Sequence, residues 1–159
     1  MAQSFLTPIY GVIQNISPSQ NQCCDSLITL LTSNGIVRFA AGPDTSIIDA
    51  ARLSPGMSVA AFYDPNLPVP LIFPPQYQAI IIARRRQNEN VAAGFFNRNL
   101  IAVDQSLQLN IGSSTEITTA NGLPFNCGPG GQYLVVFYTA TTRSIPPQTT
   151  PRRIVVFCG

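Results

Sequence analysis

Short runs of β-branched and aromatic residues alternate along the chain with clusters of proline, glycine and asparagine. Runs of this kind, bounded by turn-forming residues, predict strands and not helices. The predicted strands fall into two series of five. They are Ile9–Ile16, Leu27–Thr32, Ile36–Ala41, Met57–Tyr63 and Tyr77–Arg84 in the first series, and Val91–Asn97, Ser106–Ile111, Glu116–Thr119, Tyr133–Tyr138 and Arg152–Cys158 in the second.

A single segment has a helical pattern. Thr45–Leu53 (TSIIDAARL) places apolar residues at helical spacing, with Asp44 or Thr45 as the N-cap. The sequence Ser54-Pro55-Gly56 then ends the predicted helix. Fourteen prolines and eleven glycines argue against an all-α fold. The sequence therefore predicts a mainly β protein with one short helix.

The two series of strands align with each other. Gly56–Tyr63 (GMSVAAFY) matches Gly131–Tyr138 (GQYLVVFY), and in each half a polar, proline-bearing loop containing PPQ and an apolar strand follow. Two β-rich segments always align to some degree by chance, but here FY, PPQ and the last strand keep their order. The period of about 75 residues is the length of a small domain. We therefore predict an internal duplication, with domains at residues 5–86 and 90–159.

Five strands with a helix between the third and the fourth resemble the OB-fold, a small Greek-key barrel. The first half matches this element order better. In the second half Asn121–Gly131, which is too rich in glycine and proline to be helical, replaces the helix. The resemblance implies two tandem five-stranded OB-like β-barrels. A single ten-stranded β-sandwich is the alternative.

The amino-acid composition excludes several classes of function. The chain has 159 residues, of which 45% are hydrophobic and 10% charged, against roughly 25% charged in a typical soluble domain. It contains no lysine, tryptophan or histidine. Without histidine, neither a Ser-His-Asp site nor a His-ligated metal site can form. The acidic residues are scattered singly, and no phosphate-binding loop is present. We therefore predict a protein that is not an enzyme, with no cofactor and no metal site.

The N-terminal sequence MAQSFLTPIYGVIQ has no basic region and no long apolar core, so we predict no Sec-type signal peptide. No apolar run approaches the roughly 18 residues of a transmembrane helix, so we predict no membrane span.

Four cysteines stand out because of their positions. Cys23 and Cys24 are neighbours in a polar loop, Cys127 lies in the Gly/Pro-rich segment, and Cys158 is the penultimate residue. The CxxC-type spacing typical of zinc sites is absent. Neighbouring cysteines pair poorly with each other, because a normal disulfide needs more separation. These four residues are therefore candidates for disulfides between chains, and four reduced, partly buried thiols are the alternative.

Two clusters of basic residues are the candidates for contact with nucleic acid. They are Arg84-Arg85-Arg86, between the two predicted domains, and Arg152-Arg153. Binding of a single strand needs a basic groove together with aromatic side chains on which bases stack. The net charge of only +2 is small for such a protein. The alternative is that residues 84–86 form a solvated junction that protects a strand edge.

These features favour a structural subunit. Low charge weakens repulsion between copies, strand edges offer hydrogen-bonding seams, and thiols in loops can lock an assembly. This character is similar to that of the disulfide-cross-linked β-subunits of bacterial endospore appendages. The resemblance implies self-assembly into a filament or surface layer at the spore or cell surface. The alternative is an OB-type module that binds single-stranded nucleic acid or another ligand, which implies a cytoplasmic location.

Overall fold

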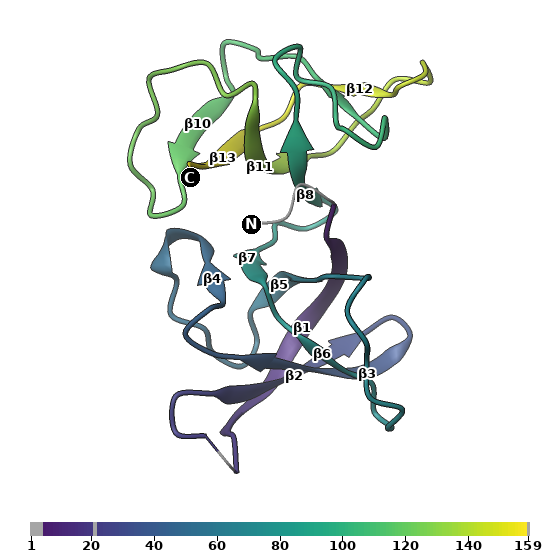
Figure 1. The fold of residues 1–159 in the computed structure, drawn as a ribbon, viewed down its shortest axis with the longest axis vertical. Helices are drawn as coiled ribbons and strands as arrows, with labels where there is room; N and C mark the ends of the chain where they lie inside the picture. Colours follow the sequence, from purple (N-terminus) through teal and green to yellow (C-terminus); the bar gives the residue numbers. More distant parts are fainter. Residues whose placement is uncertain (1–4, 21, 159) are drawn as a thin grey trace. The chain divides into compact units, whose positions relative to one another are not determined.

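The structure is a computed structural model that describes residues 5–20 and 22–158 (Figure 1). The prediction of a mainly β protein is confirmed, because the regular elements of these residues are strands apart from one 3-10 turn. The chain divides into two compact units (Figure 1). We call Thr7–Arg86 the first unit, and residues 5–6 together with 87–158 the second unit.

The first unit contains one seven-stranded sheet with the order β4-β7-β5-β1-β2-β3-β6. Strands β1, β2 and β3 form an antiparallel meander, and β5 pairs antiparallel with both β1 and β7. Two short parallel pairs, β3 with β6 and β4 with β7, form the ends of the sheet. The strands are β1 (Thr7–Pro18), β2 (Ser26–Thr32), β3 (Gly35–Ala41), β4 (Ser46–Ile47), β5 (Ser58–Tyr63), β6 (Gln76–Gln78) and β7 (Ile81–Arg84).

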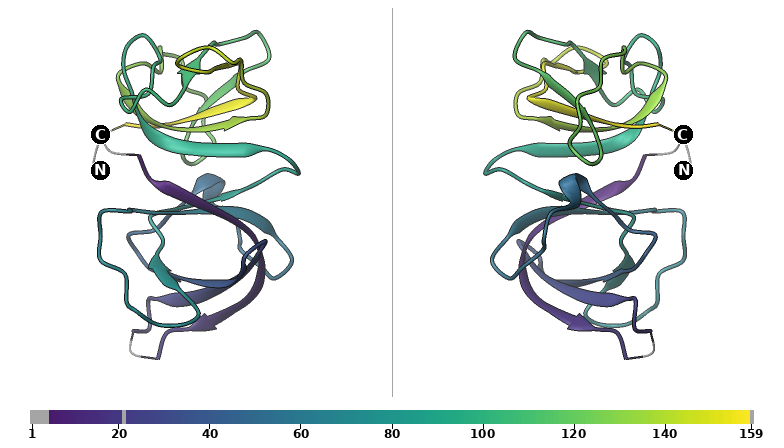
Figure 2. Two further views of the ribbon diagram at one scale, coloured as in Figure 1. Left: turned by 90° about the vertical axis from the view of Figure 1, so that its right-hand side faces the viewer. Right: turned by 90° about the vertical axis from the view of Figure 1, so that its left-hand side faces the viewer.

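No sheet in the described residues closes into a barrel, in contrast to the expected OB-like barrels. Ala79 and Ile80 join β6, at one end of the sheet, to β7, which is the second strand from the other end. The amide of Ala79 donates to the carbonyl of Ala40 in β3 at 2.9 Å, and that of Ile80 donates to Phe62 in β5 at 2.8 Å. These two residues connect the ends of a strongly curled sheet (Figure 2).

Along the strands of the first unit, every second side chain points toward the concave inner side of the curled sheet. This arrangement forms one apolar core of eight buried residues. They are Ile13, Ile28, Leu30, Phe39, Val59, Ala61, Ala79 and Ile82.

The second unit contains a four-stranded sheet with the order β10-β13-β11-β8 and a two-stranded sheet of β12 and β9. Phe5 packs in this unit, with its ring centroid 5.6 Å from that of Phe96, within a second core that includes Leu134 and Ile154. The strands are β8 (Asn90–Phe96), β9 (Gln108–Leu109), β10 (Glu116–Thr119), β11 (Gln132–Tyr138), β12 (Gln148–Thr149) and β13 (Arg153–Phe157).

The predicted helix at Thr45–Leu53 is wrong. Its first residues form the short strand β4, which pairs in parallel with β7, and Ile48–Ala50 forms the 3-10 turn η1. Asp49 and Ala50 have φ values of 64° and 50°, in the left-handed region, so the α-helical path cannot continue. Pairing with β7 and burial of Ile48 outweigh the local helical spacing.

Strand pairing and hydrogen bonding recur in the two units at corresponding positions. In each unit a threonine hydroxyl accepts from a glycine amide three residues earlier and donates to a carbonyl ahead of the last strand. Thr45 does this with Gly42 (3.1 Å) and Ala79 (2.8 Å). Thr115 repeats it with Gly112 (3.1 Å) and Pro151 (2.7 Å). The duplication of the chain stays a hypothesis, and this matched pair of bonds offers a test of it.

If the two threonines are equivalent, Thr45→Val and Thr115→Val should destabilise their own units to a similar extent. Each change removes one donor and one acceptor from a part-buried site, so we expect a loss of about 1–3 kcal/mol in the free energy of unfolding. Urea denaturation followed by circular dichroism measures it. Thr141→Val, at an exposed position, is the control and should change stability by less than about 0.5 kcal/mol. A large loss for only one of the two threonines would contradict equivalence.

Candidate functional site

All four cysteines are free and exposed. Cys23 and Cys24 lie in the connection between β1 and β2, which hydrogen bonds from the amide of Ser19 to the carbonyl of Asp25 (3.0 Å) and from the amide of Asp25 to Gln22 (3.3 Å) hold together. Cys127 lies in the loop between β10 and β11, and Cys158 follows β13. The described residues contain no disulfide.

Groups of three or more Cys, His, Asp or Glu side chains that could hold a metal ion do not occur among the described residues. Cys23 and Cys24 are adjacent in sequence, and adjacent cysteines do not fit the geometry of an ordinary disulfide.

In the basic cluster at residues 84–86, one arginine contacts an aromatic ring of the first unit and the other two are exposed. Arg84 and Arg86 are exposed at the end of β7. The guanidinium of Arg85 lies 4.1 Å from the centroid of the Tyr10 ring, which is a cation–π contact. Two arginines of this cluster therefore face solvent, and the third covers an aromatic ring of its own unit.

Both arginines of the second basic cluster, Arg152 and Arg153, bind side chains of the second unit. Arg152 binds the buried carboxylate of Glu89 with two parallel hydrogen bonds, Nε to Oε2 at 2.8 Å and Nη2 to Oε1 at 2.9 Å. Arg153 is only 9% exposed and donates to the hydroxyl of Thr118 at 2.8 and 3.2 Å. Its Nε lies 3.4 Å from a carboxylate oxygen of Glu116. A phosphate at either guanidinium would have to displace these partners.

The sequence analysis missed an apolar surface in the first unit. The loop that follows β5 was expected to be polar, but nine consecutive exposed residues, 65–73 (PNLPVPLIF), carry no charge and five large apolar side chains. Leu71 is fully exposed and Phe73 is 93% exposed. The absence of any charged residue from 65 to 83 was the signal in the sequence. We call residues 65–73 the apolar loop.

A row of apolar side chains on the neighbouring sheet extends this surface. Val12 of β1 pairs with Leu31 of β2, and Leu31 pairs with Ile36 of β3. Directly paired residues project from the same face of a sheet. All three side chains are at least 40% exposed, which is unusual for a run of three large aliphatic residues. We call them the aliphatic row.

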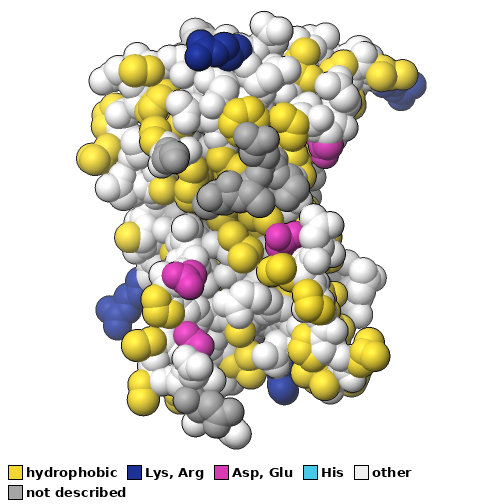
Figure 3. All heavy atoms as spheres, viewed as in Figure 1, with side chains coloured by type: hydrophobic (Ala, Val, Ile, Leu, Met, Phe, Trp, Pro, Cys, Tyr) yellow, Lys and Arg dark blue, Asp and Glu magenta, His cyan; other side chains and the backbone are white. Residues whose placement is uncertain are grey.

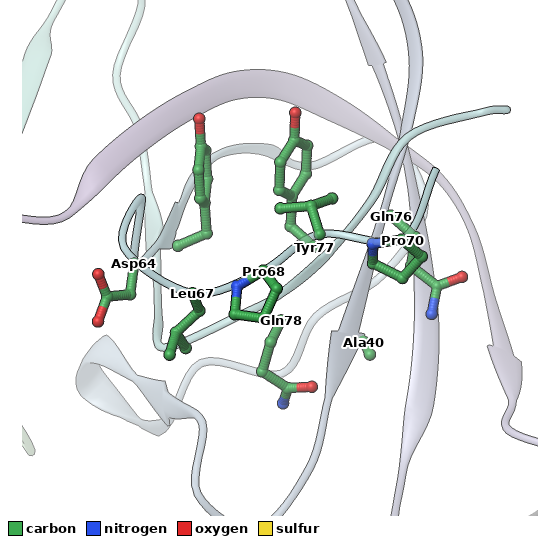
Figure 4. A pocket seen from close by; sticks show the side chains of 10 residues that line it. Ala40, Asp64, Leu67, Pro68, Pro70, Gln76, Tyr77 and Gln78 are labelled. Carbon is green, nitrogen blue, oxygen red and sulfur yellow. The ribbon is translucent and has the colours of Figure 1, made fainter. Parts of the chain in front are cut away.

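Two hollows lie beside the apolar loop. The smaller one, of about 230 Å³, lies between the loop and β6, where Leu67, Pro68 and Pro70 run alongside Tyr77 (Figure 4). The rings of Tyr63 and Tyr77 stack there with centroids 4.2 Å apart. Burial, and to a smaller extent the neighbouring Tyr77, raises the pKa of the Tyr63 hydroxyl above its ordinary value.

The larger hollow, of about 470 Å³, is where the loop meets the sheet. Its lining includes Tyr10 of β1, Ile36 and Val37 of β3, Phe73 of the apolar loop and Tyr77 of β6. No charged side chain lines it. Ile36 belongs to both the hollow and the aliphatic row, so the two features form one surface. Figure 3 shows apolar side chains gathered along the right-hand margin of the first unit.

Comparison with known proteins gives no assignment: no protein-family model, curated protein or solved structure matches this chain. Within the part of the chain that the structure describes, no helix has the length and apolar character needed to cross a bilayer.

Proposed function

We propose that this protein is a non-enzymatic structural subunit that self-assembles into a filament or surface layer. In the proposed assembly, disulfides between copies lock contacts that form first without covalent bonds. A spore or cell-surface location is part of the same proposal.

The observation that carries the proposal is the placement of the cysteines. All four are exposed and lie outside the strands, and none has a disulfide partner within the described chain. Buried thiols would be inert and would need no explanation, whereas exposed ones react according to their access. Bridges at these four positions would join copies without disturbing either core.

The surface chemistry supports the same function. With only 10% charged residues, copies repel one another weakly. The first unit adds the apolar loop and the aliphatic row, whose eight large apolar side chains are each at least 37% exposed, and exposed apolar patches mark interaction sites. Self-association is the simplest way to remove such a surface from water.

Negative-stain electron microscopy of the purified protein, with and without reductant, tests this function. We expect regular filaments or sheets under oxidising conditions, and shorter or dissociating ones after reduction. Dispersed single particles under both conditions, across the accessible concentration range, would contradict the proposal.

Binding of single-stranded nucleic acid is the second candidate, and the exposed Arg84 and Arg86 are the observation that favours it. Because few phosphates can be neutralised, we expect weak binding that disappears at moderate salt. Fluorescence titration with a labelled oligonucleotide measures this. Tight, salt-resistant binding would reverse the order of the two candidates.

A further inference from the structure

The apolar loop has the properties of a segment that binds to a groove on another surface. Three of its nine residues, Pro65, Pro68 and Pro70, are prolines, and each fixes the backbone dihedral angle φ at its position. Proline also lacks an amide donor, so the loop leaves few hydrogen bonds to satisfy on docking. A pre-ordered segment loses little conformational entropy when it binds, which is why extended proline-rich segments dock well into aromatic grooves.

The larger hollow is shaped to receive such a segment. It has aromatic walls at Tyr10 and Tyr77, an aliphatic wall at Ile36 and Val37, and no charged side chain. An acidic peptide or a phosphate group would lose its hydration there and would find no charged side chain among the lining residues. Because the polar residues Thr32, Ser33 and Asn34 also line the hollow, the occupant that fits this chemistry is uncharged and mostly apolar.

The exposed area agrees with a stable protein–protein contact. The aliphatic row and the five large side chains of the apolar loop together expose the equivalent of more than four whole side chains. If each side chain has about 180 Å² of surface, the exposed apolar area is roughly 800 Å². This is close to the area that each partner buries in a standard interface.

We propose that the apolar loop of one copy docks into the larger hollow of a second copy, over the aliphatic row, and that the second copy does the same in return. Phe73 belongs to both the loop and the hollow, so a two-fold axis near Phe73 brings each loop to its partner's hollow. This contact rests on the proposed function, because it names the non-covalent step of the assembly.

The symmetry has a consequence for assembly. A two-fold contact is closed, so on its own it produces dimers. Growth beyond the dimer needs a second contact at a different surface, which bridges through the four exposed cysteines then lock. In the resulting assembly, dimers held by the apolar contact are the units, and disulfides stabilise the contacts between these dimers.

The test starts from a full-length variant with serine at all four cysteine positions, so that only non-covalent contacts remain. Sedimentation equilibrium over a wide concentration range should show a monomer–dimer equilibrium. Adding Phe73→Asp should weaken dimerisation at least about thirty-fold, because it places a charge in the apolar contact twice. A dimer unchanged by Phe73→Asp, or a cysteine-free protein that remains monomeric, overturns the inference.

Ile145→Asp is the matched control. Ile145 is 98% exposed, precedes a Pro-Pro-Gln sequence as Phe73 does, and lies in the second unit between β11 and β12. It should leave the dimer unchanged. Circular dichroism should show the same thermal midpoint for both aspartate variants, since both positions are exposed.

A cross-linking experiment tests the geometry. Two cysteine-free proteins, one with Leu71→Cys and one with Ser33→Cys and a distinguishing tag, are mixed and mildly oxidised. Ser33 lines the hollow, so a mixed disulfide between the two proteins is expected. Ser113→Cys, exposed in the second unit, replaces Ser33→Cys as the control and should cross-link poorly. Equal yields from both mixtures overturn the inference.

The two proposals fail in different ways. If wild-type protein forms multimers under oxidation while Phe73→Asp leaves non-covalent association unchanged, the docking contact is wrong and the structural function stands. If wild-type protein forms no assembly in either redox state, the proposed function itself fails.

Discussion

Assembled wild-type protein should show multimers on non-reducing electrophoresis that collapse to a single 17.1 kDa band with reductant. The reason is that, in the proposed assembly, at least one of the four exposed cysteines forms a bridge between two chains. A covalent bridge keeps a subunit from regaining the translational freedom that dissociation would give it, so it stabilises the assembly beyond its surface contacts. A lone monomer band without reductant, from material seen to be assembled by microscopy, would contradict the prediction.

Cys23→Ser combined with Cys24→Ser locates the bridge. Both side chains are exposed on the β1–β2 connection, so the variant should unfold with the same free energy as wild type, within about 0.5 kcal/mol. Its assemblies, however, should dissociate at lower temperature and denaturant concentration. Cys127→Ser and Cys158→Ser are the matched single changes in the second unit, and they show whether those thiols also form bridges.

Local patterns in the sequence predicted strand identity well. Glu116–Thr119 was predicted with its observed bounds, because β-branched residues and flanking turn residues marked both ends. The pairing of strands that are distant in sequence was harder to predict from these local patterns. The run Tyr77–Arg84 was predicted as one strand, but Ala79 and Ile80 direct their amides to β3 and β5, so it divides into β6 and β7. Thr45–Leu53 failed for a related reason, since the pairing of β4 with β7 decides its conformation.

The candidate sites were predictable only where exposure follows from local sequence. Cysteines in loops and at the last strand were expected to be accessible, and they are exposed. The partners of Arg152 and Arg153 were not predictable, because Glu89 and Thr118 are distant in sequence. The apolar loop was misjudged since its prolines were taken as markers of a polar turn, although its other residues are mostly large and apolar.

Arg152→Met should cause one of the largest losses of stability in the second unit. The change leaves the carboxylate of Glu89, which is 3% exposed, without the guanidinium that binds it through two hydrogen bonds. Removing one partner of a fully buried pair costs about 3–5 kcal/mol. Because the Arg152 side chain is itself 32% exposed, we expect about 2–4 kcal/mol in urea denaturation. Arg143→Met, at an exposed position in the loop after β11, should change stability by less than about 0.5 kcal/mol.

A double-mutant cycle separates the ion pair from the packing of the arginine. Glu89→Gln removes the buried charge, so in the double variant Arg152→Met no longer leaves a carboxylate without its guanidinium. The double variant should therefore be more stable than the sum of the two single losses implies, with a coupling of about 1–3 kcal/mol. Additive losses would mean that Arg152 acts mainly by packing over the Phe137 ring, whose centroid lies 5.2 Å from its guanidinium carbon. In that case its guanidinium would be less firmly held by Glu89, and the argument against a phosphate-binding role for Arg152 would weaken.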